Sequence, residues 1–369
     1  MRQRASVIVL VAVAVLLFGY VATHRDPVRR PDPPQSAATP SGLPRVVGDR
    51  EFGPPGLKLL VTGEHPQIID TSTGQVSPVP GVKLTNGARA AVQIVPAGTV
   101  ITEIAPSASR TRTTLAPKTG GRTVVLGDSV VVVPALHGTD LYVSSHDAGR
   151  TKVTITTPAG AIRSSWTIGG TATPIRDTAA GLVVQQIGDR GVAELRVLDP
   201  RSGATRRVLS VGAVLVAVGP GSVAYVPPDC RGDCPLSVTG LVDGRTRSYP
   251  LPPNTGNPGT GAFAPDGHRL ALGVPGQYRD GRLTVVPGFA EVLDLQTGQF
   301  VRIPGLDTAA ERSPDLSWSG GTLVLGVWSG SGGQVASWSA DRKDELRVLP
   351  ATPPGDAAFS SVTVLPTTR

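Results

Sequence analysis

A repeated pattern of short apolar runs and tight turns most strongly constrains the fold of this chain. The clearest copy lies between Gly261 and Gly298, where the runs AFA, HRLALGV and AEVLDL alternate with the turn sequences PDG and QTG, and QFVRIPG follows. Short apolar runs separated by Asp-Gly or Thr-Gly turns are typical of antiparallel strands. This unit therefore predicts a four-stranded antiparallel sheet.

Looser copies of the same unit recur along the chain. Their first strands are expected near Arg89, Asp128, Thr171, Ala213, Gly259, Pro314 and Ala357, and successive starts differ by 39 to 55 residues. Sheets that recur every roughly 40–50 residues are typical of propeller blades. We attribute the longest interval to a loop at Gly276–Gly288. The sequence predicts an all-β, seven-bladed β-propeller, with six or eight blades as alternatives because the second and third copies are poorly marked.

The two ends of the repeated region complement each other. Leu57–Pro80 contains only three strands, and the innermost strand of that blade is missing. Ala357–Pro366, with the sequence AAFSSVTVLP, is expected to supply it. A ring closed in this way leaves no open sheet edge at the junction. The propeller is therefore predicted to span residues 57–366 and to be closed by the C-terminal strand 357–366.

The turn between the third and fourth strands is the best marker of a blade. Strong copies contain the pairs Asp70 and Gly74, Asp199 and Gly203, and Asp294 and Gly298, and weaker copies are Thr157–Gly160 and Val242–Gly244. An Asp side chain in such a turn can accept hydrogen bonds from backbone amides. These hairpins resemble the D-x-x-T-G hairpins of WD-type, YVTN-type and TolB-like propellers. The turn at Asp266 and Gly267 resembles the S-P-D-G turn of the same group, and the resemblance implies a fold rather than an activity.

A second motif resembles the Asp box of sialidases. Residues 145–151, SHDAGRT, match S-x-D-x-G-x-T, although Lys152 stands where that family has an aromatic residue. In sialidases the box is a structural hairpin away from the active site. The resemblance therefore implies that Asp147 and Gly149 form a structural turn. No position matches a sialidase catalytic motif, so we assign no catalytic residue.

Cys230 and Cys234 are the only two cysteines. A C-x3-C pair in a tight loop can bring its Cα atoms within the roughly 7 Å that a disulfide needs. No further cysteine and no nearby histidine completes a zinc site. We expect a disulfide and hence an oxidising compartment. No metal or cofactor is expected, and Asp280 and Asp315 would bind calcium only if acidic residues converge in the fold.

The N-terminal residues predict a membrane anchor followed by a linker. Ala5–Ala22 is apolar and uncharged, and eighteen residues span about 27 Å as a helix. The sequence after it offers poor cleavage sites, so we favour a transmembrane signal anchor at residues 1–24 over a cleaved signal peptide. Residues 25–56 are rich in proline and are expected to form a disordered linker. Because long domains are translocated largely regardless of flanking charge, we place the domain that follows outside the membrane.

Composition limits the functions that remain. The net charge is +7, but the arginines are scattered and are not interleaved with aromatic residues, which argues against a nucleic-acid surface. The preference for Arg, Ala, Gly and Pro resembles that of actinobacterial proteins. We interpret the chain as a non-catalytic, membrane-tethered, extracytoplasmic propeller that binds a protein, peptide or other envelope component. The alternative is an extracytoplasmic propeller enzyme of the sialidase, lactonase or lyase type.

Overall fold

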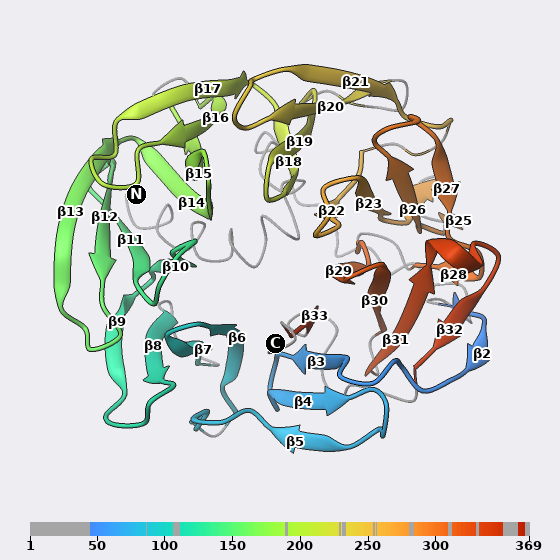
Figure 1. The fold of residues 1–369 in the computed structure, drawn as a ribbon, viewed down its shortest axis with the longest axis horizontal. Coiled ribbons are helices and arrows are strands. Elements are labelled where there is room, and N and C mark those ends of the chain that lie inside the picture. The colour runs from blue at the N-terminus through green and yellow to red at the C-terminus, as the bar shows by residue number, and fades with distance from the viewer. Residues whose placement is uncertain are drawn as a thin grey trace, which may run out of the picture.

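The described part of the chain forms a ring of antiparallel sheets around a central axis (Figure 1). The computed structural model describes residues 45–85, 87–105, 111–188, 191–228, 230, 234–253, 255, 257–279, 284–308, 312–329, 332–349 and 361–365. Within these residues, seven sheets contain four or more strands each. The prediction of an all-β, seven-bladed propeller is therefore confirmed.

Each blade contains four strands in order from the axis to the rim, and two blades carry additions. Blade 1 consists of β33 (Val362–Val364), β3 (Lys58–Val61), β4 (Gln67–Asp70) and β5 (Val76–Pro78); blade 2 of β6 (Arg89–Val95), β7 (Gly98–Ile104), β8 (Thr111–Pro117) and β9 (Val124–Asp128); blade 3 of β10 (Val131–Pro134), β11 (Leu141–Asp147), β12 (Arg150–Thr156) and β13 (Ile162–Gly169); blade 4 of β14 (Thr171–Thr178), β15 (Gly181–Ile187), β16 (Ala193–Leu198) and β17 (Thr205–Val211).

The remaining three blades follow in the same order around the ring. Blade 5 consists of β18 (Val214–Val218), β19 (Ser222–Val226), β20 (Pro235–Gly240) and β21 (Thr246–Pro250); blade 6 of β22 (Thr260–Phe263), β23 (Arg269–Val274), β26 (Phe289–Asp294) and β27 (Phe300–Arg302); blade 7 of β29 (Asp315–Ser319), β30 (Thr322–Ser329), β31 (Gly332–Ser339) and β32 (Leu346–Val348). A short 3-10 helix, Ala340–Arg342, follows β31.

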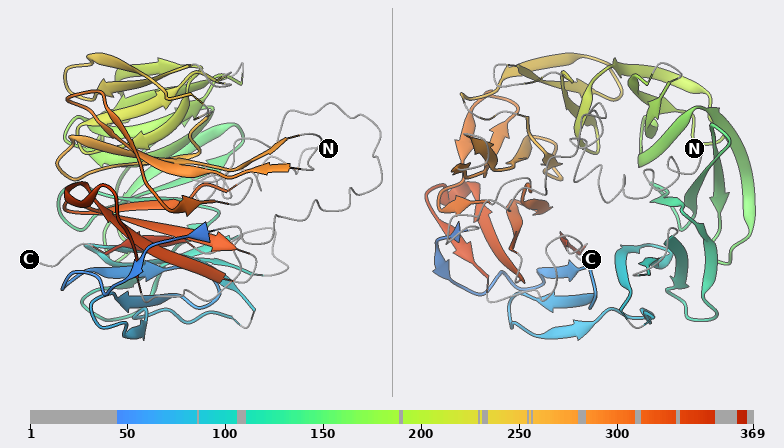
Figure 2. Two further views of the ribbon diagram at one scale, coloured as in Figure 1. Left: turned by 90° about the vertical axis from the view of Figure 1, so that its right-hand side faces the viewer. Right: turned by 180° about the vertical axis from the view of Figure 1, so that it is seen from behind.

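The disc has two distinct faces (Figure 2). We call the face at the right of the side view in Figure 2 the upper face. It carries the connections from the second strand of a blade to the third and from each blade to the next. The lower face carries the turns between the first and second strands and between the third and fourth. In the side view of Figure 2, a two-stranded hairpin of blade 6, β24 (Gln277–Arg279) with β25 (Thr284–Val286), extends from the upper face.

The core lies in the seams between blades rather than at the centre of the ring. Seven clusters of buried side chains occur among the described residues, one in each seam. Strand β15 shows how the sequence builds two of them. Leu182 and Val184 pack toward blade 3, whereas Val183 between them packs toward blade 5. Successive side chains of a strand point to opposite faces, so an uninterrupted apolar run fills two seams at once.

The first and last parts of the described chain meet in blade 1. Strand β33 pairs with β3 in an antiparallel register that places Thr363 opposite Leu60. The hydroxyl groups of Thr62 and Ser361 lie 2.8 Å apart beside this pair. The C-terminal segment thus supplies the innermost strand of the blade whose other strands come from residues 58–78.

The predicted linker at 25–56 extends too far along the chain. Strand β1 (Arg45–Val46) pairs with β28 (Leu306–Asp307), and β2 (Asp49–Arg50) adds a fifth, parallel strand to the rim of blade 7. Glu51 also forms a 2.6 Å ion pair with Arg347. Residues 45–51 therefore pack on blades 6 and 7, where strand edges more than 250 residues away provide their hydrogen-bonding partners. The proline content of the segment, on which the linker prediction rested, does not reveal these partners.

Two smaller expectations in the blades also need correction. The first strand of blade 3 begins at Val131, and Asp128 ends the outermost strand of blade 2. Only Ser129 and Val130 separate the two blades, which explains the poor marking of this boundary. The expected loop at Gly276–Gly288 contains the β24–β25 hairpin, in which Gln277 pairs with Val286.

The predicted anchor at residues 1–24 and most of the linker lie outside the described residues. Among the residues that are described, none belongs to a helix with the length and hydrophobicity needed to cross a membrane. Asp280 and the Arg-Gly-Asp residues between the two cysteines likewise lie outside the described part.

Candidate functional site

The Asp residues of the third-to-fourth-strand turns bind backbone of their own turns. Oδ1 of Asp294 accepts hydrogen bonds from the amides of Gln296 at 2.9 Å and Thr297 at 2.8 Å. Oδ1 of Asp199 accepts two corresponding bonds of 2.9 Å each. The backbone bond from Thr297 is the main cause that lowers the pKa of Asp294. These carboxylates are spread around the lower face, so they stabilise turns and do not converge on a ligand.

The other two predicted Asp turns differ in position and detail. Oδ1 of Asp70 accepts hydrogen bonds from the hydroxyl of Ser72 at 2.6 Å and its amide at 3.0 Å, and the hydroxyl bond is the main cause that lowers the pKa of Asp70. Asp266 lies in a turn between a first and a second strand, where its Oδ1 accepts the amide of His268 at 2.9 Å. Both turns are on the lower face.

The turn glycines also allow neighbouring blades to approach closely. A Cβ on Gly203 would lie 2.5 Å from the indole ring of Trp166, which belongs to the outermost strand of the preceding blade. A Cβ on Gly160 would lie 2.7 Å from Val124, which occupies the corresponding place one blade earlier. The turn of one blade therefore rests on the rim strand of the blade before it.

The motif that resembles an Asp box lies at a different place in its blade. Asp147 and Arg150 are paired at the end of the hairpin between β11 and β12, the second and third strands of blade 3. The two turn residues between them, Ala148 and Gly149, have φ values of 46° and 76°. Positive φ at both central residues is the geometry of a two-residue hairpin turn. The motif therefore forms a hairpin on the upper face.

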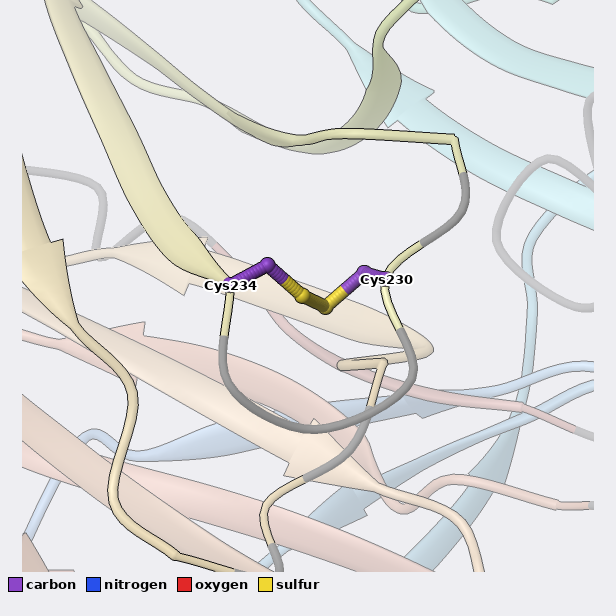
Figure 3. Close-up of a disulfide and its surroundings, with 2 residues drawn as sticks. All are labelled: Cys230 and Cys234. Carbon is purple, nitrogen blue, oxygen red and sulfur yellow. A yellow bond between two sulfur atoms is a disulfide. The ribbon is translucent and has the colours of Figure 1, made fainter.

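The cysteine pair closes a short loop on the upper face of blade 5 (Figure 3). Cys230 and Cys234 form a disulfide with a Cα–Cα distance of 5.5 Å, between strands β19 and β20. Cys230 is buried and packs in the apolar cluster between blades 5 and 6. The bond therefore fixes the loop against the core of this seam.

The described part of the structure contains two buried carboxyl groups, those of Asp315 and Glu291. Sequence reasoning named Asp315 but not Glu291. Burial raises the pKa of Asp315 to about 6, although Arg312 opposes the shift. Burial also raises the pKa of Glu291 to about 7, and Thr255 donates a 3.4 Å hydrogen bond to it. The two groups have separate sets of contacts in blades 7 and 6. Among the described residues, no three acidic, histidine or cysteine side chains are placed to hold a metal ion.

An open groove of about 520 Å³ lies at the seam between blades 3 and 4. It is lined by Gly169, Gly170, Gln186, Gly188, Val192, Glu194, Arg196 and Val211. Gly169 is the last residue of β13, Gly170 follows it, and Gly188 follows β15. The other lining residues come from strands β15, β16 and β17 and from the loop before β16. These strand ends belong to the upper face, which in propellers carries the longer connections.

The floor of the groove is polar and internally paired. The guanidinium of Arg196 donates to Oε2 of Glu194 through Nε at 2.8 Å and Nη2 at 2.5 Å. Gln186 donates its amide to the carbonyl oxygen of Gly169 at 2.6 Å, which joins the two blades. The side-chain oxygen of Gln186 is buried and has no hydrogen-bond partner among the described residues. The described floor therefore contains a buried acceptor that is shielded from solvent, beside an ion pair whose charges balance.

The walls of the groove are aliphatic and exposed. Val211 is 62 % exposed and Val192 is 39 % exposed, and neighbouring Ile187 is 41 % exposed. None of the described lining residues is aromatic. Sequence reasoning did not find this groove, because its lining residues come from two blades and match no motif.

Comparison with known proteins shows the fold only. No protein-family model and no curated protein matches the chain. It is similar to TolB from Acinetobacter baumannii, with a TM-score of 0.46 and 14 % identity over 88 % of this chain and 83 % of that one. It is also similar to prolyl endopeptidases, with a TM-score of 0.57 and 9 % identity over 86 % of this chain and 50 % of that one.

A third similar structure is a puromycin-hydrolyzing peptidase of Mycobacterium tuberculosis, with a TM-score of 0.51 and 14 % identity over 88 % of this chain and 56 % of that one. The chain thus spans about half the length of both peptidases. At these identities the comparisons show a β-propeller, the fold shared by the WD-type and TolB-like proteins that the turn motifs resemble, and they assign no activity.

Proposed function

We propose that this protein is a binding module displayed outside a cell membrane, and that it recognises a protein or peptide through the upper face of its propeller. The groove between blades 3 and 4 is the observation that carries this proposal. It combines exposed aliphatic side chains with a floor on which Glu194 and Arg196 pair with each other. Exposed apolar surface of this kind gains stability when a partner covers it.

The location rests on one feature of the sequence and two of the structure. The uncharged stretch at residues 5–22 has the length of a membrane span. The disulfide between Cys230 and Cys234 favours an oxidising compartment. The described residues begin at Arg45, whose strand β1 pairs with β28 in the upper-face connection from blade 6 to blade 7. Residues 25–44 would then connect the anchor to the upper face beside blades 6 and 7, away from the groove between blades 3 and 4.

A pull-down of the intact protein from gently solubilised membranes tests the proposal, together with a thiol-alkylation mass measurement on rapidly quenched cells. We expect a specific envelope partner and no free thiol. Two free thiols in freshly quenched cells would contradict the extracytoplasmic location. A wild-type protein that retains no partner above the level of an unrelated anchored domain would contradict the binding function.

An extracytoplasmic enzyme is the second candidate, and Glu291 is the observation that favours it. Its carboxyl group is buried near the upper face with a pKa raised to about 7, a value suited to proton transfer. A panel of glycosides and lactones would test this function. Turnover that Glu291→Gln abolishes would support it, and no turnover on the panel would leave the binding module as the better account.

A further inference from the structure

We propose that the lower rim of blades 4 and 5 is a second interaction surface, which binds an acidic, extended segment of another protein. This surface lies on the face opposite the groove and does not depend on it. It consists of five arginine side chains, here called the arginine patch: Arg201, Arg206, Arg207, Arg245 and Arg247.

The fold brings these arginines together from two blades. Arg206 and Arg207 lie at the start of β17, and Arg247 lies in β21, and these are the outermost strands of adjacent blades (Figure 1). Arg207 reaches the lower-face turn of blade 5, because a Cβ built on Gly244 would lie 2.5 Å from its Nη1 atom. Arg245 follows that glycine directly. The patch is therefore continuous across the seam, although its members are separated in the sequence.

Most of the patch is exposed and has no carboxylate partner. Arg201, Arg245 and Arg247 are exposed, and none of them forms an ion pair with a described residue. Arg206 is paired, with its Nη2 atom 2.6 Å from Oδ2 of Asp199. The lower-face turns of blades 4 and 5 are described throughout, so the charge of this part of the rim is known.

The two aspartates of the same turns do not neutralise the patch. Oδ1 of Asp199 accepts amides of its own turn, and Oδ2 pairs with Arg206. Oδ1 of Asp243 accepts the backbone amide of Arg245 at 3.0 Å. Five arginines and two aspartates leave a net charge of +3 on the two turns and strand starts. A surface with an excess of one sign attracts and orients a partner of the opposite sign.

The surroundings of the patch favour a polypeptide as the acidic partner. Guanidinium groups bind carboxylates through paired hydrogen bonds. Val242, beside Asp243, is 71 % exposed and offers an apolar contact that a side chain of a peptide can use. On the described lower rim of these blades no aromatic ring is free to stack on a nucleobase, because Tyr249 is buried.

The rim of blade 7 shows how an acidic extended segment binds to this ring. Strand β2 adds in parallel to β32, with Asp49 opposite Arg347, and Glu51 forms an ion pair with the same arginine. Strands β17 and β21 also end their sheets at the rim, and neither pairs with a further strand among the described residues. The rim of blades 4 and 5 thus offers both the open strand edges and the arginines that hold residues 49–51 on blade 7.

The acidic segment is expected to come from a different protein. Residues 1–44 contain five arginines and two aspartates, so they are repelled by the patch rather than attracted to it. A second copy bound in a two-fold contact would place the same arginines opposite each other, and like charges in direct opposition are destabilising.

Fluorescence anisotropy with the full-length protein in mild detergent tests the proposal. The probe is a fluorescein-labelled peptide, Gly-Asp-Val-Glu-Asp-Val-Glu-Gly, and its matched counterpart carries Asn and Gln in place of Asp and Glu. The salt concentration is about 0.15 M, at which interactions between exposed charges beyond about 8 Å are largely screened. We expect the acidic peptide to bind at least tenfold more tightly than the neutral one.

Two double charge reversals separate the patch from the overall charge of the protein. Arg201→Glu with Arg245→Glu reverses two exposed members of the patch. Lys118→Glu with Arg122→Glu is the matched control, because both residues are exposed in the corresponding lower-face turn of blade 2 and the net charge changes equally. We expect the first pair to weaken binding of the acidic peptide at least tenfold and the control pair to weaken it less than twofold.

A further comparison identifies the class of partner. We expect Val242→Ser to reduce the advantage of the acidic peptide over a version with Gly in place of Val. Melting temperatures within a few degrees of the parent establish that each variant is folded. Equal losses in the two double variants would overturn the inference. Binding of a short DNA duplex or of phosphatidylglycerol vesicles as tightly as the acidic peptide would also overturn it, because the patch would then be a general anion site.

The peptide measurement is separate from the membrane pull-down. If the wild-type protein retains no envelope partner but binds the acidic peptide with the expected pattern of variants, the proposed binding function is contradicted and the role of the patch is supported. If it retains a specific envelope partner but does not prefer the acidic peptide, the binding function is supported and the role of the patch is overturned.

Discussion

The indole nitrogen of Trp328 donates a 2.7 Å hydrogen bond to Oδ2 of Asp315, and the same oxygen accepts the amide of Val362 at 2.9 Å. One buried carboxylate therefore connects the first and second strands of blade 7 to the strand that closes blade 1. Arg312 lies over the Trp328 ring, 5.2 Å from its centroid. The hydrogen bonds to Asp315 add to a closure that is also made by main-chain pairing, apolar packing and the hydroxyl contact between Thr62 and Ser361.

Asp315→Ala is expected to destabilise the propeller by about 3 kcal/mol, because it leaves two buried N–H donors without an acceptor. Chemical unfolding monitored by tryptophan fluorescence would measure the change. Asp341→Ala, at an exposed position in the short 3-10 helix, is the matched control and should unfold with the parent. Equal midpoints for Asp315→Ala and the parent would show that the carboxylate does not hold the closing strand.

Stability should also depend on pH through the two buried carboxyl groups. Because burial raises the pKa of Glu291 to about 7, above its value in an unfolded chain, the folded protein holds a proton there that the unfolded chain has lost. The resulting stabilisation is present below the unfolded pKa and disappears as the pH rises through about 7. Glu291→Gln should therefore become more stable relative to the parent between pH 5 and pH 8.

Thermal melting of both proteins at pH 5, 6, 7 and 8 would show this widening difference. Glu345→Gln, at an exposed position, is the control and should keep a constant difference from the parent. A constant difference for Glu291→Gln as well would mean that Glu291 titrates in the folded protein as it does in the unfolded chain. Asp315, with a pKa raised to about 6, contributes in the same direction at lower pH.

The turn glycines provide a matched pair of substitutions. Gly203 and Gly267 have nearly the same φ, 71° and 73°, so an alanine at either position is strained by about 1 kcal/mol. The new Cβ at Gly203 also meets the ring of Trp166, whereas at Gly267 no atom of the described residues lies within 4 Å. Gly203→Ala should therefore destabilise the protein by about 2 kcal/mol more than Gly267→Ala does. Equal midpoints in urea would show that blades 3 and 4 separate at no cost.

Removal of the closing strand should be severe. A chain that ends at residue 357 lacks β33, which exposes the inner edge of β3 and removes Val362 from the apolar cluster between blades 7 and 1. We expect a large loss of thermal stability and aggregation through the exposed edge. A chain that lacks only residues 367–369 is the control. Co-melting of the longer deletion with the parent would contradict closure by this strand.

The sequence by itself determined the repeated architecture. Turns such as Asp294–Gly298 are local, because the acceptor and the amides that it binds lie within four residues of each other. The strands between these turns are apolar on both faces, as the seams require. The number of blades and most strand starts follow from this local chemistry. The predicted start at Asp128 is wrong, because only two residues separate blades 2 and 3 there.

Only the tertiary structure decided what the repeats bring together. Gln186 and Gly169 are seventeen positions apart and form a groove because blades 3 and 4 meet there. Asp315 reaches Val362 because the ring closes, and Glu51 reaches Arg347 because a rim strand is free to pair. Such contacts depend on register and on which sheet edges are available. Those properties arise from the whole ring, so residue type and spacing along the chain do not specify them.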